Sequence, residues 1–449
     1  MSVRVTVIGG GSSMFVPGLV RRLIEIPCFD GADLRLMDVD AARAGVMEQL
    51  AVELAAAEER KLTVSSTTDQ RAALRGADFV IVAISVGGMK AWASDIEIPG
   101  KHGVFMHIAD SIGPGGIFRA LRNTPVVASV ATDVSELAPD AFVLNYTNPA
   151  SANAIAMAKV SSVRSLSLCS CSPLPYQRAW LSGLTGAAEE DVLLPVAVGG
   201  INHCTAMMSL QLRDGRDAIP LIRERTDDEV VRWAIDNFGV VPYCSGHWVE
   251  FFPQLQRLQD SYSGRAQGLA MKYGTRIFDM DDTLARVRSW EEIASAWHRE
   301  GGQHRLADLP RGPEDDGIIV AELMQAIIED RAERFIVNVI NHGLIPNLPS
   351  SAAVEVPAVV DAGGVHPAGI GPIPGGLAAV LSRHALVQEL TAEAALTGDK
   401  ATLRQVMTAD PLLDSLLEPP QIQALLEEML AANAPMLPNF SGHHAGARS

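Results

Sequence analysis

A glycine-rich loop follows the first apolar run of the chain and constrains the fold more than any other segment. Residues 3–8 alternate as Val-Arg-Val-Thr-Val-Ile, which predicts a β-strand, and apolar residues from Phe15 to Ile24 then recur at helical spacing. The loop between them comprises Gly9, Gly10, Gly11, Ser12 and Ser13. Glycines let the backbone approach a pyrophosphate, whose charge is met by amides at the start of the following helix. This order predicts a dinucleotide site; an ordinary tight turn is the alternative, because the third glycine of the common fingerprint is absent.

The next segments continue the alternation of strands and helices. Residues 34–38 predict a second strand that ends in Asp38, residues 41–60 predict an alanine-rich helix, and residues 62–64 predict a short third strand. A carboxylate at the end of the second strand accepts hydrogen bonds from ribose hydroxyls and repels a 2′-phosphate. Asp38 therefore predicts NAD+ rather than NADP+.

Two later apolar runs, residues 78–84 and 141–145, predict central parallel strands that are covered on both faces. The first run ends before Ser85, and the second ends at Asn145, three residues before Asn148. Ligands of open α/β sheets bind beyond the carboxyl ends of the strands. We therefore expect Ser85 and Asn145 to contact the cofactor and Asn148 to contact the substrate.

The regular alternation stops near residue 172, which predicts two domains in an α/β protein. Residues 1–172 are expected to form a Rossmann-like, doubly wound parallel sheet that binds NAD+, and residues 173–449 a mixed, mostly helical lobe for substrate binding and oligomerisation. The long helices expected in this lobe cover residues 220–238, 317–328, 377–396 and 422–432. The Pro/Gly-rich residues 346–376 predict an excursion between helices, and residues 435–449 predict a frayed tail.

Composition excludes several classes of partner. The 449 residues carry a formal net charge of −17, which repels nucleic acids and anionic membranes. The N-terminus lacks a basic and apolar leader, and no segment approaches about 18 uncharged apolar residues. Five irregularly spaced cysteines predict reduced thiols rather than a disulfide framework. We therefore expect a cytoplasmic protein with a small-molecule ligand, no nucleic acid and no membrane.

Two further sites carry residue types suited to chemistry. The pair Gly115-Gly116 predicts the start of a helix that faces an anion or sugar hydroxyls, with Asp110 just outside it; helix capping is the alternative. Further along, Cys169 and His203 are ligand types for a divalent metal with open coordination positions. Taken alone, a buried thiol and a hydrogen-bonded core histidine are the simpler interpretation of these two residues.

The sequence of these segments resembles glycoside hydrolase family 4, the NAD-dependent glycosidases built on a scaffold like that of lactate and malate dehydrogenases. It is also similar to a related group of NAD-dependent sulfoquinovosidases. The most specific segment is Asp-x-x-Gly-Pro-Gly-Gly-Ile-Phe-Arg-Ala-Leu-Arg over residues 110–122. Ordered matches continue at residues 145–149, 168–169, 200–203, 247–253, 338–349, 354–357 and 410–411. The resemblance thus extends over nearly the whole chain.

The resemblance implies a metal site and a mechanism. The residues matching Cys169 and His203 hold a divalent metal, usually Mn2+, beside the C2 and C3 hydroxyls of the sugar. NAD+ takes hydride from C3, the C2 proton becomes acidic and is removed, the aglycone leaves by elimination, water adds, and NADH reduces C3 again, which departs from the paired-carboxylate route. Many members carry His, Asp or Asn after the cysteine to protonate the leaving group, whereas this chain has Ser170, a poor general acid.

The resemblance also indicates catalytic residues. Tyr243 and His247 fall where the family places the base that removes the C2 proton, and a tyrosine needs a lowered pKa for that task. Asp110 is a third catalytic candidate. Arg119 and His203 are expected to contact substrate. For Tyr243 and His247, a packing role is the alternative interpretation.

The substrate that the resemblance implies is an unphosphorylated α-glycoside. Members that act on 6-phosphosugars often carry arginine where this chain has Ser85. A locally basic stretch permits an acidic sugar, a uronide or a sulfoquinovoside, although nearby acids partly offset it and a solvated face is the alternative; it contains Lys101, His102, His107, Arg119 and Arg122. Two other functions stay open: a hydroxy-acid or sugar dehydrogenase that releases NADH, and an inactive NAD-binding sensor suggested by Ser170. The family resemblance also implies a homodimer or homotetramer.

Overall fold

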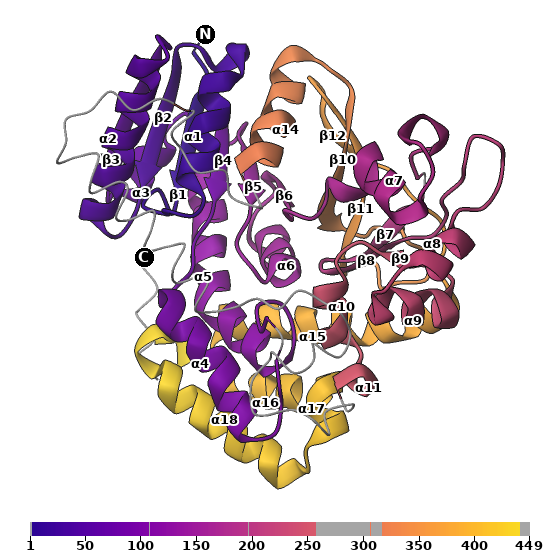
Figure 1. Ribbon diagram of the computed structural model, residues 1–449. Helices are drawn as coiled ribbons and strands as arrows, with labels where there is room; N and C mark the ends of the chain where they lie inside the picture. The colour runs from indigo at the N-terminus through magenta and orange to yellow at the C-terminus, as the bar shows by residue number, and fades with distance from the viewer. Residues whose placement is uncertain (1, 107, 196, 257–305, 307–316, 441–449) are drawn as a thin grey trace.

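The structure, a computed structural model, describes residues 2–106, 108–195, 197–256, 306 and 317–440. Its described strands form one 12-stranded sheet in the order β3-β2-β1-β4-β5-β6-β10-β11-β7-β8-β9, with β12 paired to β11 (Figure 1). The strands of the first half are β1 (Arg4–Ile8), β2 (Ala32–Met37), β3 (Leu62–Thr67), β4 (Phe79–Val82), β5 (Phe142–Asn145) and β6 (Arg164–Ser167). All pair in parallel, in the 3-2-1-4-5-6 order of a Rossmann fold, which confirms the predicted fold class.

Strand alternation sends apolar side chains to both faces of this parallel sheet. Val5 and Val7 of β1 face a core with α1 (Val16–Glu25), α2 (Ala41–Ala57) and α14 (Gly317–Glu329). Ile8 faces the opposite core with α3 (Gln70–Leu74), α5 (Gly113–Leu137) and Met157 of α6 (Ala150–Val160). Both faces are buried, as expected of parallel strands.

The second half of the chain extends the same sheet. Its strands are β7 (Val198–Ile201), β8 (Cys204–Met207), β9 (Val241–Pro242), β10 (Glu333–Ile340), β11 (Ala353–Asp361) and β12 (Gly364–Pro367). Antiparallel β10 joins the Rossmann half at β6, and α14 packs against α1. Because the sheet runs across residue 172, the division into residues 1–172 and 173–449 stays a prediction.

Half of the remaining described helices form a layer below the sheet (Figure 1). They are α4 (Gly88–Lys101), α15 (Gly375–Thr397), α16 (Lys400–Ala409), α17 (Pro411–Leu416) and α18 (Pro419–Asn433). A shared core joins Phe118 of α5 to Leu403 and Leu425, so the first half of the chain is built into this layer. The helices nearer β7–β9 are α7 (Arg178–Thr185), α8 (Ile219–Arg225), α9 (Glu229–Phe238) and α10 (Ser245–Phe251), and α11 (Pro253–Gln256) lies beside α17. No helix among the described residues is long and apolar enough to cross a membrane.

Three expectations about the second half were wrong. Residues 220–238 form two helices, because the Asp228 side chain accepts hydrogen bonds from the amides of Val230 and Val231 and starts α9 anew. Residues 346–376 contain β11 and β12, where alternate apolar residues of β11 are buried against β10. The tail is ordered as far as Phe440, whose ring is buried; residues 441–449 lie outside the described chain.

Candidate active site

The glycine loop joins β1 to α1 at the point where the strand order reverses. Gly9 has φ 97°, and a Cβ there would lie 2.2 Å from the carbonyl oxygen of Ala83, so only glycine fits. The Gly11 amide donates to Asp38 Oδ2 at 2.9 Å, and the Ser12 hydroxyl accepts from the Phe15 amide at 3.2 Å. The loop and Asp38 therefore form one unit, with Ser13 buried at the approach to α1.

Hydrogen bonds tie the ends of β4 and β5 together next to this loop. The Ile84 amide donates to Thr147 Oγ1 at 2.9 Å, beside Ser85, which is exposed. The side chain of Asn145 is buried and bonded to Thr147 and to Ser167 Oγ. Ser85 is thus open to a ligand, whereas Asn145 shapes the end of β5 through contacts within the protein.

Asp110, His203 and His247 meet in one cluster, with their candidate ligand atoms within 4.8 Å of one another. Asp110 precedes α5, His203 lies in the β7–β8 turn with φ 68°, and His247 lies on α10. Asp110 and His203 are buried, whereas His247 is half-buried. The structure therefore brings together three residues that the sequence placed in separate motifs.

Asp110 is held by hydrogen bonds from several directions. Asn148 Nδ2 donates to its Oδ2 at 2.7 Å, and Ser111 Oγ donates to its Oδ1 at 2.7 Å. The Ser111 hydroxyl also contacts His203 Nδ1 at 2.8 Å. Burial alone would raise the pKa of Asp110, but His203, with weaker help from His247 and Arg119, holds that pKa well below its usual range. Asp110 is consequently a carboxylate that stays ionised and can bind a cation.

Cys169 lies beside His203 at the end of β6. Its thiol is buried, and its pKa is raised by a hydrogen bond with Cys171 and by burial, although His203 opposes the shift. Burial lowers the pKa of His203, but Asp110 and Cys169 outweigh it and raise that pKa well above its usual value. The expected pair of ligands is thus adjacent, and Asp110 and His247 add oxygen and nitrogen donors that suit Mn2+.

Tyr243 is buried beside a carboxylate. Its hydroxyl donates to Glu355 Oε2 at 2.5 Å in the buried sheet region. Burial and the Glu355 charge raise its pKa well above the usual value, which is opposite to the shift that the proposed base needs. The base roles of Tyr243 and His247 both stay predictions. His247 Nδ1 lies 2.6 Å from Cys244 Sγ.

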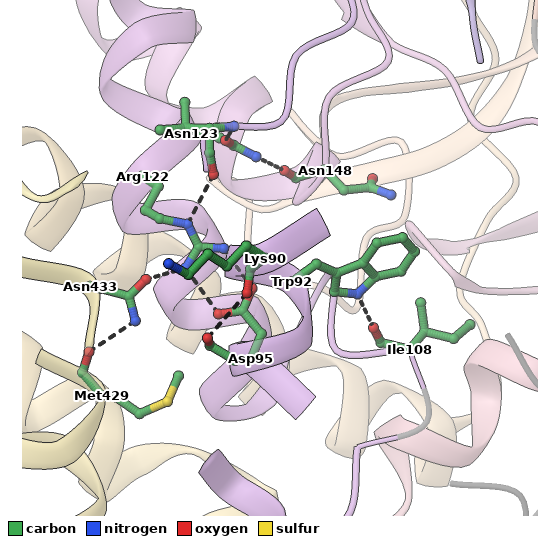
Figure 2. A network of polar contacts seen from close by, with 11 residues as sticks. Lys90, Trp92, Asp95, Ile108, Arg122, Asn123, Asn148, Met429 and Asn433 are labelled. Carbon is green, nitrogen blue, oxygen red and sulfur yellow. Dashed lines mark hydrogen bonds and ion pairs between the residues drawn. The ribbon is translucent and has the colours of Figure 1, made fainter. Parts of the chain in front are cut away.

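Two nearby arginines differ in their partners. The Arg122 guanidinium is fully engaged by Asp95 at 2.5–2.9 Å and by Asn433 at 2.7 Å (Figure 2). Arg119 instead lies 5.2 Å from the Trp92 ring centroid, and its buried Nε and Nη1 have no hydrogen-bond partner among the described residues. Burial lowers the pKa of Arg119, opposed by Asp110 and Asp95. Arg119 therefore has two buried donors without a partner among the described residues, whereas Arg122 joins helices.

The basic stretch does not form one patch among the described residues. Lys101 and His102 both contact Glu428 at the surface. His107 lies outside the described chain. Arg119 contributes to the charge around Asp110.

Sequence reasoning missed two buried carboxyl groups near the cluster. Glu250 Oε1 accepts from the amides of Ile108 (2.6 Å) and Ala109 (2.9 Å), directly before Asp110. Glu355 binds Tyr243, Ser172 and Asn338. The spacing of His247 and Glu250, one helical turn apart, was an available signal for the first group.

Family models match both halves of the chain: "Family 4 glycosyl hydrolase" over residues 4–174 and "Family 4 glycosyl hydrolase C-terminal domain" over residues 198–413. The chain belongs to glycosyl hydrolase family 4. This family 4 chain is 29% identical to an α-galactosidase of Bacillus subtilis, over 97% of this chain and 99% of the relative. It is 28% identical to an α-galactosidase of Rhizobium meliloti (98% and 90%) and 26% identical to an α-galacturonidase of Lachnoclostridium phytofermentans (97% and 97%). Glycoside hydrolysis, not simple dehydrogenation, is therefore its activity.

Solved structures support the same fold for this family 4 enzyme. The lplD protein of Bacillus subtilis matches with a TM-score of 0.81 at 23% identity, over 96% of this chain and 100% of the other. The 6-phospho-β-glucosidase of Thermotoga maritima, solved with manganese, NAD+ and glucose-6-phosphate, matches with a TM-score of 0.77 at 24% identity, over 97% and 99%. A malate dehydrogenase of Plasmodium falciparum matches more distantly, with a TM-score of 0.50 at 14% identity over 88% and 98%.

Proposed function

We propose that this family 4 enzyme is an NAD+-dependent glycosidase that cleaves an unphosphorylated α-glycoside of an acidic sugar, a uronide or a sulfoquinovoside. The observation that carries the proposal is Arg119, which has two buried, unpartnered donor nitrogens and interacts electrostatically with Asp110. An anionic group on the sugar would supply the missing acceptor. The α-galacturonidases among the relatives support this choice, and so does the absence of arginine at Ser85.

The cofactor would be held by the glycine loop and Asp38. The loop residues Gly9–Ser13 suit the pyrophosphate, and the Asp38 carboxylate suits the ribose hydroxyls. When bound, NAD+ supplies a reversible hydride acceptor for sugar C3, and Mn2+ supplies polarisation of the C2 and C3 oxygens. NAD+ and Mn2+ in related solved structures support both assignments.

The protein residues divide the remaining tasks. His203 and Asp110 of the cluster, with Cys169 beside His203, are the proposed cation ligands, and Asn148 holds the Asp110 carboxylate by a hydrogen bond. His247 is the proposed base for the C2 proton, because it is the half-exposed member of the cluster. In the tautomer whose Nδ1–H donates to Cys244 Sγ, its Nε2 keeps a lone pair for that proton. The leaving-group acid stays unassigned, since Ser170 cannot protonate an oxygen efficiently at neutral pH.

A panel of 4-nitrophenyl glycosides tests this proposal. The α-galactoside, α-glucoside, α-glucuronide, α-sulfoquinovoside and 6-phosphate derivatives are assayed with and without NAD+ and a chelator. We expect an acidic, unphosphorylated α-glycoside to be cleaved fastest, with cleavage lost in chelator and restored by Mn2+. Arg119→Gln should raise KM for the acidic substrate about 10- to 100-fold, the effect of losing a hydrogen bond to a charged group. Equal effects on neutral and acidic glycosides would contradict the role of Arg119.

The matched control is Arg223→Gln. Arg223 forms an exposed ion pair with Asp236 and has no proposed role in the site. The Arg223→Gln substitution removes the same charge from the protein as Arg119→Gln, and we expect unchanged KM values. A cytoplasmic location and a homodimer or homotetramer complete the proposal; light scattering of the purified protein tests the assembly.

A further inference from the structure

Three cysteines lie around the cluster of Asp110, His203 and His247, on two separate segments. Cys169 and Cys171 belong to the turn after β6, and Cys244 immediately precedes α10. The Sγ atoms of Cys171 and Cys244 are 3.5 Å apart, although 73 positions separate them in the sequence. All five cysteines are free thiols in the structure. The fold thus brings two thiols from distant segments into van der Waals contact.

We propose that Cys171 and Cys244 are a reversible disulfide site, oxidised by a peroxide. One Sγ attacks the peroxide, takes up one oxygen as a sulfenic acid and releases water. The second Sγ then displaces that oxygen, which leaves as a second water with the remaining thiol proton. In balance, two thiols and H2O2 give one disulfide and two waters. The Sγ atoms need only approach from 3.5 Å to about 2.05 Å.

The pairing follows from exposure as well as distance. Cys171 and Cys244 are both half-buried, so a small oxidant reaches them. Cys169 and Cys204 are buried. Cys28 packs against the core between the Rossmann strands and helices α1, α2 and α14. Cys169 also interacts with His203, which keeps it within the cation site. Cys171 and Cys244 are therefore the pair that oxidation should join.

The disulfide would act on the active site through Cys244. Its Sγ lies 2.6 Å from His247 Nδ1, and Cys171 is hydrogen-bonded to Cys169. Bond formation draws Cys244 toward Cys171, so His247 loses its thiol partner and Cys169 loses its own. This consequence rests on the proposed function, in which His247 removes a proton and Cys169 binds the cation. We therefore expect the oxidised enzyme to lose most of its activity and to regain it with a reductant.

Mass spectrometry of the full chain tests the site without any need for turnover. The protein is treated with a small excess of H2O2, alkylated, and digested without reduction. We expect a cross-linked pair of peptides containing Cys171 and Cys244, a loss of two alkylatable thiols, and full reversal by dithiothreitol. Cys171→Ser and Cys244→Ser should each abolish the cross-link, whereas Cys28→Ser should retain it. If either serine variant folds poorly, the wild-type peptide map alone decides the pairing.

Several outcomes would overturn the proposal. They are full alkylation of both cysteines after oxidation, independent conversion to sulfinic acids, and a cross-link between Cys169 and Cys171. If the 171–244 cross-link forms in a protein that cleaves no glycoside, the proposed function fails while the disulfide site stands. If glycosides are cleaved and peroxide forms no cross-link, the disulfide site fails alone.

Discussion

The imidazole rings of His203 and His247 have centroids 3.6 Å apart and planes inclined by 33°. One ring comes from the β7–β8 turn and the other from α10, so two segments must hold their positions for the rings to meet. Two imidazolium charges this close would repel, and the Asp110 carboxylate beside them offsets that repulsion. The cluster thus depends on the three segments that carry these residues.

Glu250 is expected to position Asp110 from α10. Its side chain accepts hydrogen bonds from two backbone amides in the segment before Asp110. One of them is the amide of Ala109, a residue with φ 61°. Glu250→Ala should lower kcat at least tenfold and weaken Mn2+ binding, because both amides lose their acceptor. Glu250→Gln keeps an acceptor oxygen and should recover part of both values. Mn2+ titration beside steady-state kinetics checks this; equal defects in both variants would speak against positioning.

His247→Gln and Tyr243→Phe are expected to differ in kind. Removing a general base costs about 10²–10⁴-fold in rate, so His247→Gln should lower kcat by that amount with a small change in stability. Tyr243→Phe removes the hydrogen bond to Glu355 and should mainly lower the free energy of unfolding, by about 1–3 kcal/mol. Kinetics and urea denaturation of both variants separate the roles. A loss of rate in Tyr243→Phe as large as in His247→Gln would restore tyrosine as the base.

Arg122 is expected to be structural, in contrast to Arg119. The Arg122–Asp95 pair is almost fully buried, at 1% and 0% side-chain exposure, and Asn433 joins α18 to it (Figure 2). Arg122→Met leaves Asp95 buried without its cation and should cost about 3–5 kcal/mol of stability. Arg119→Gln should change stability much less. Thermal unfolding of the two variants checks this, and similar losses for both would contradict the distinction.

Acid should destabilise the protein partly through His384. Burial lowers its pKa from 6.5 to about 4, while its Nε2 donates to the Phe251 carbonyl. The neutral ring therefore contributes stability that is fully present above about pH 6.5 and is lost as the pH falls toward 4, by about 2 kcal/mol between pH 7 and 4.5. Asp95 and Asp410, whose pKa values burial raises to about 6, change stability in the opposite sense over this range.

His384→Gln isolates that contribution, because the two aspartates titrate in both proteins. Gln retains an N–H donor for Phe251 and does not titrate. We expect the free energy of unfolding to fall less between pH 7 and 4.5 in the variant than in the wild type. Parallel stability curves for the two proteins over this range would refute the assignment to His384.

The sequence predicted those elements of the fold whose structure depends mainly on neighbouring residues in the chain. The strand at residues 3–8, the glycine loop and Asp38 needed only alternation, helical spacing and turn chemistry. The β11 strand was missed because Pro357 and its Gly-rich surroundings indicate a loop, while its burial depends on β10 in a different part of the chain. The break before α9 was readable from Asp228, a side chain suited to begin a helix.

In the candidate site, too, the individual residues were predictable from the sequence but their arrangement in space was not. Asp110, His203 and His247 were each identifiable from their motifs, but their meeting within 4.8 Å is a product of tertiary packing. Tyr243 was assigned a base role that its burial beside Glu355 opposes. The Cys171–Cys244 approach joins two segments without a shared motif, so no spacing in the sequence indicated it.

The dependence of glycoside cleavage on NAD+ tests the central claim most directly. The enzyme is stripped of nucleotide, supplied with Mn2+ and the best substrate of the panel, and titrated with NAD+ while released nitrophenol and NADH are followed together. We predict no cleavage without NAD+, saturable recovery on its addition, and no net NADH over many turnovers. Cleavage at full rate by the stripped enzyme, or NADH formed in proportion to product, would contradict the account.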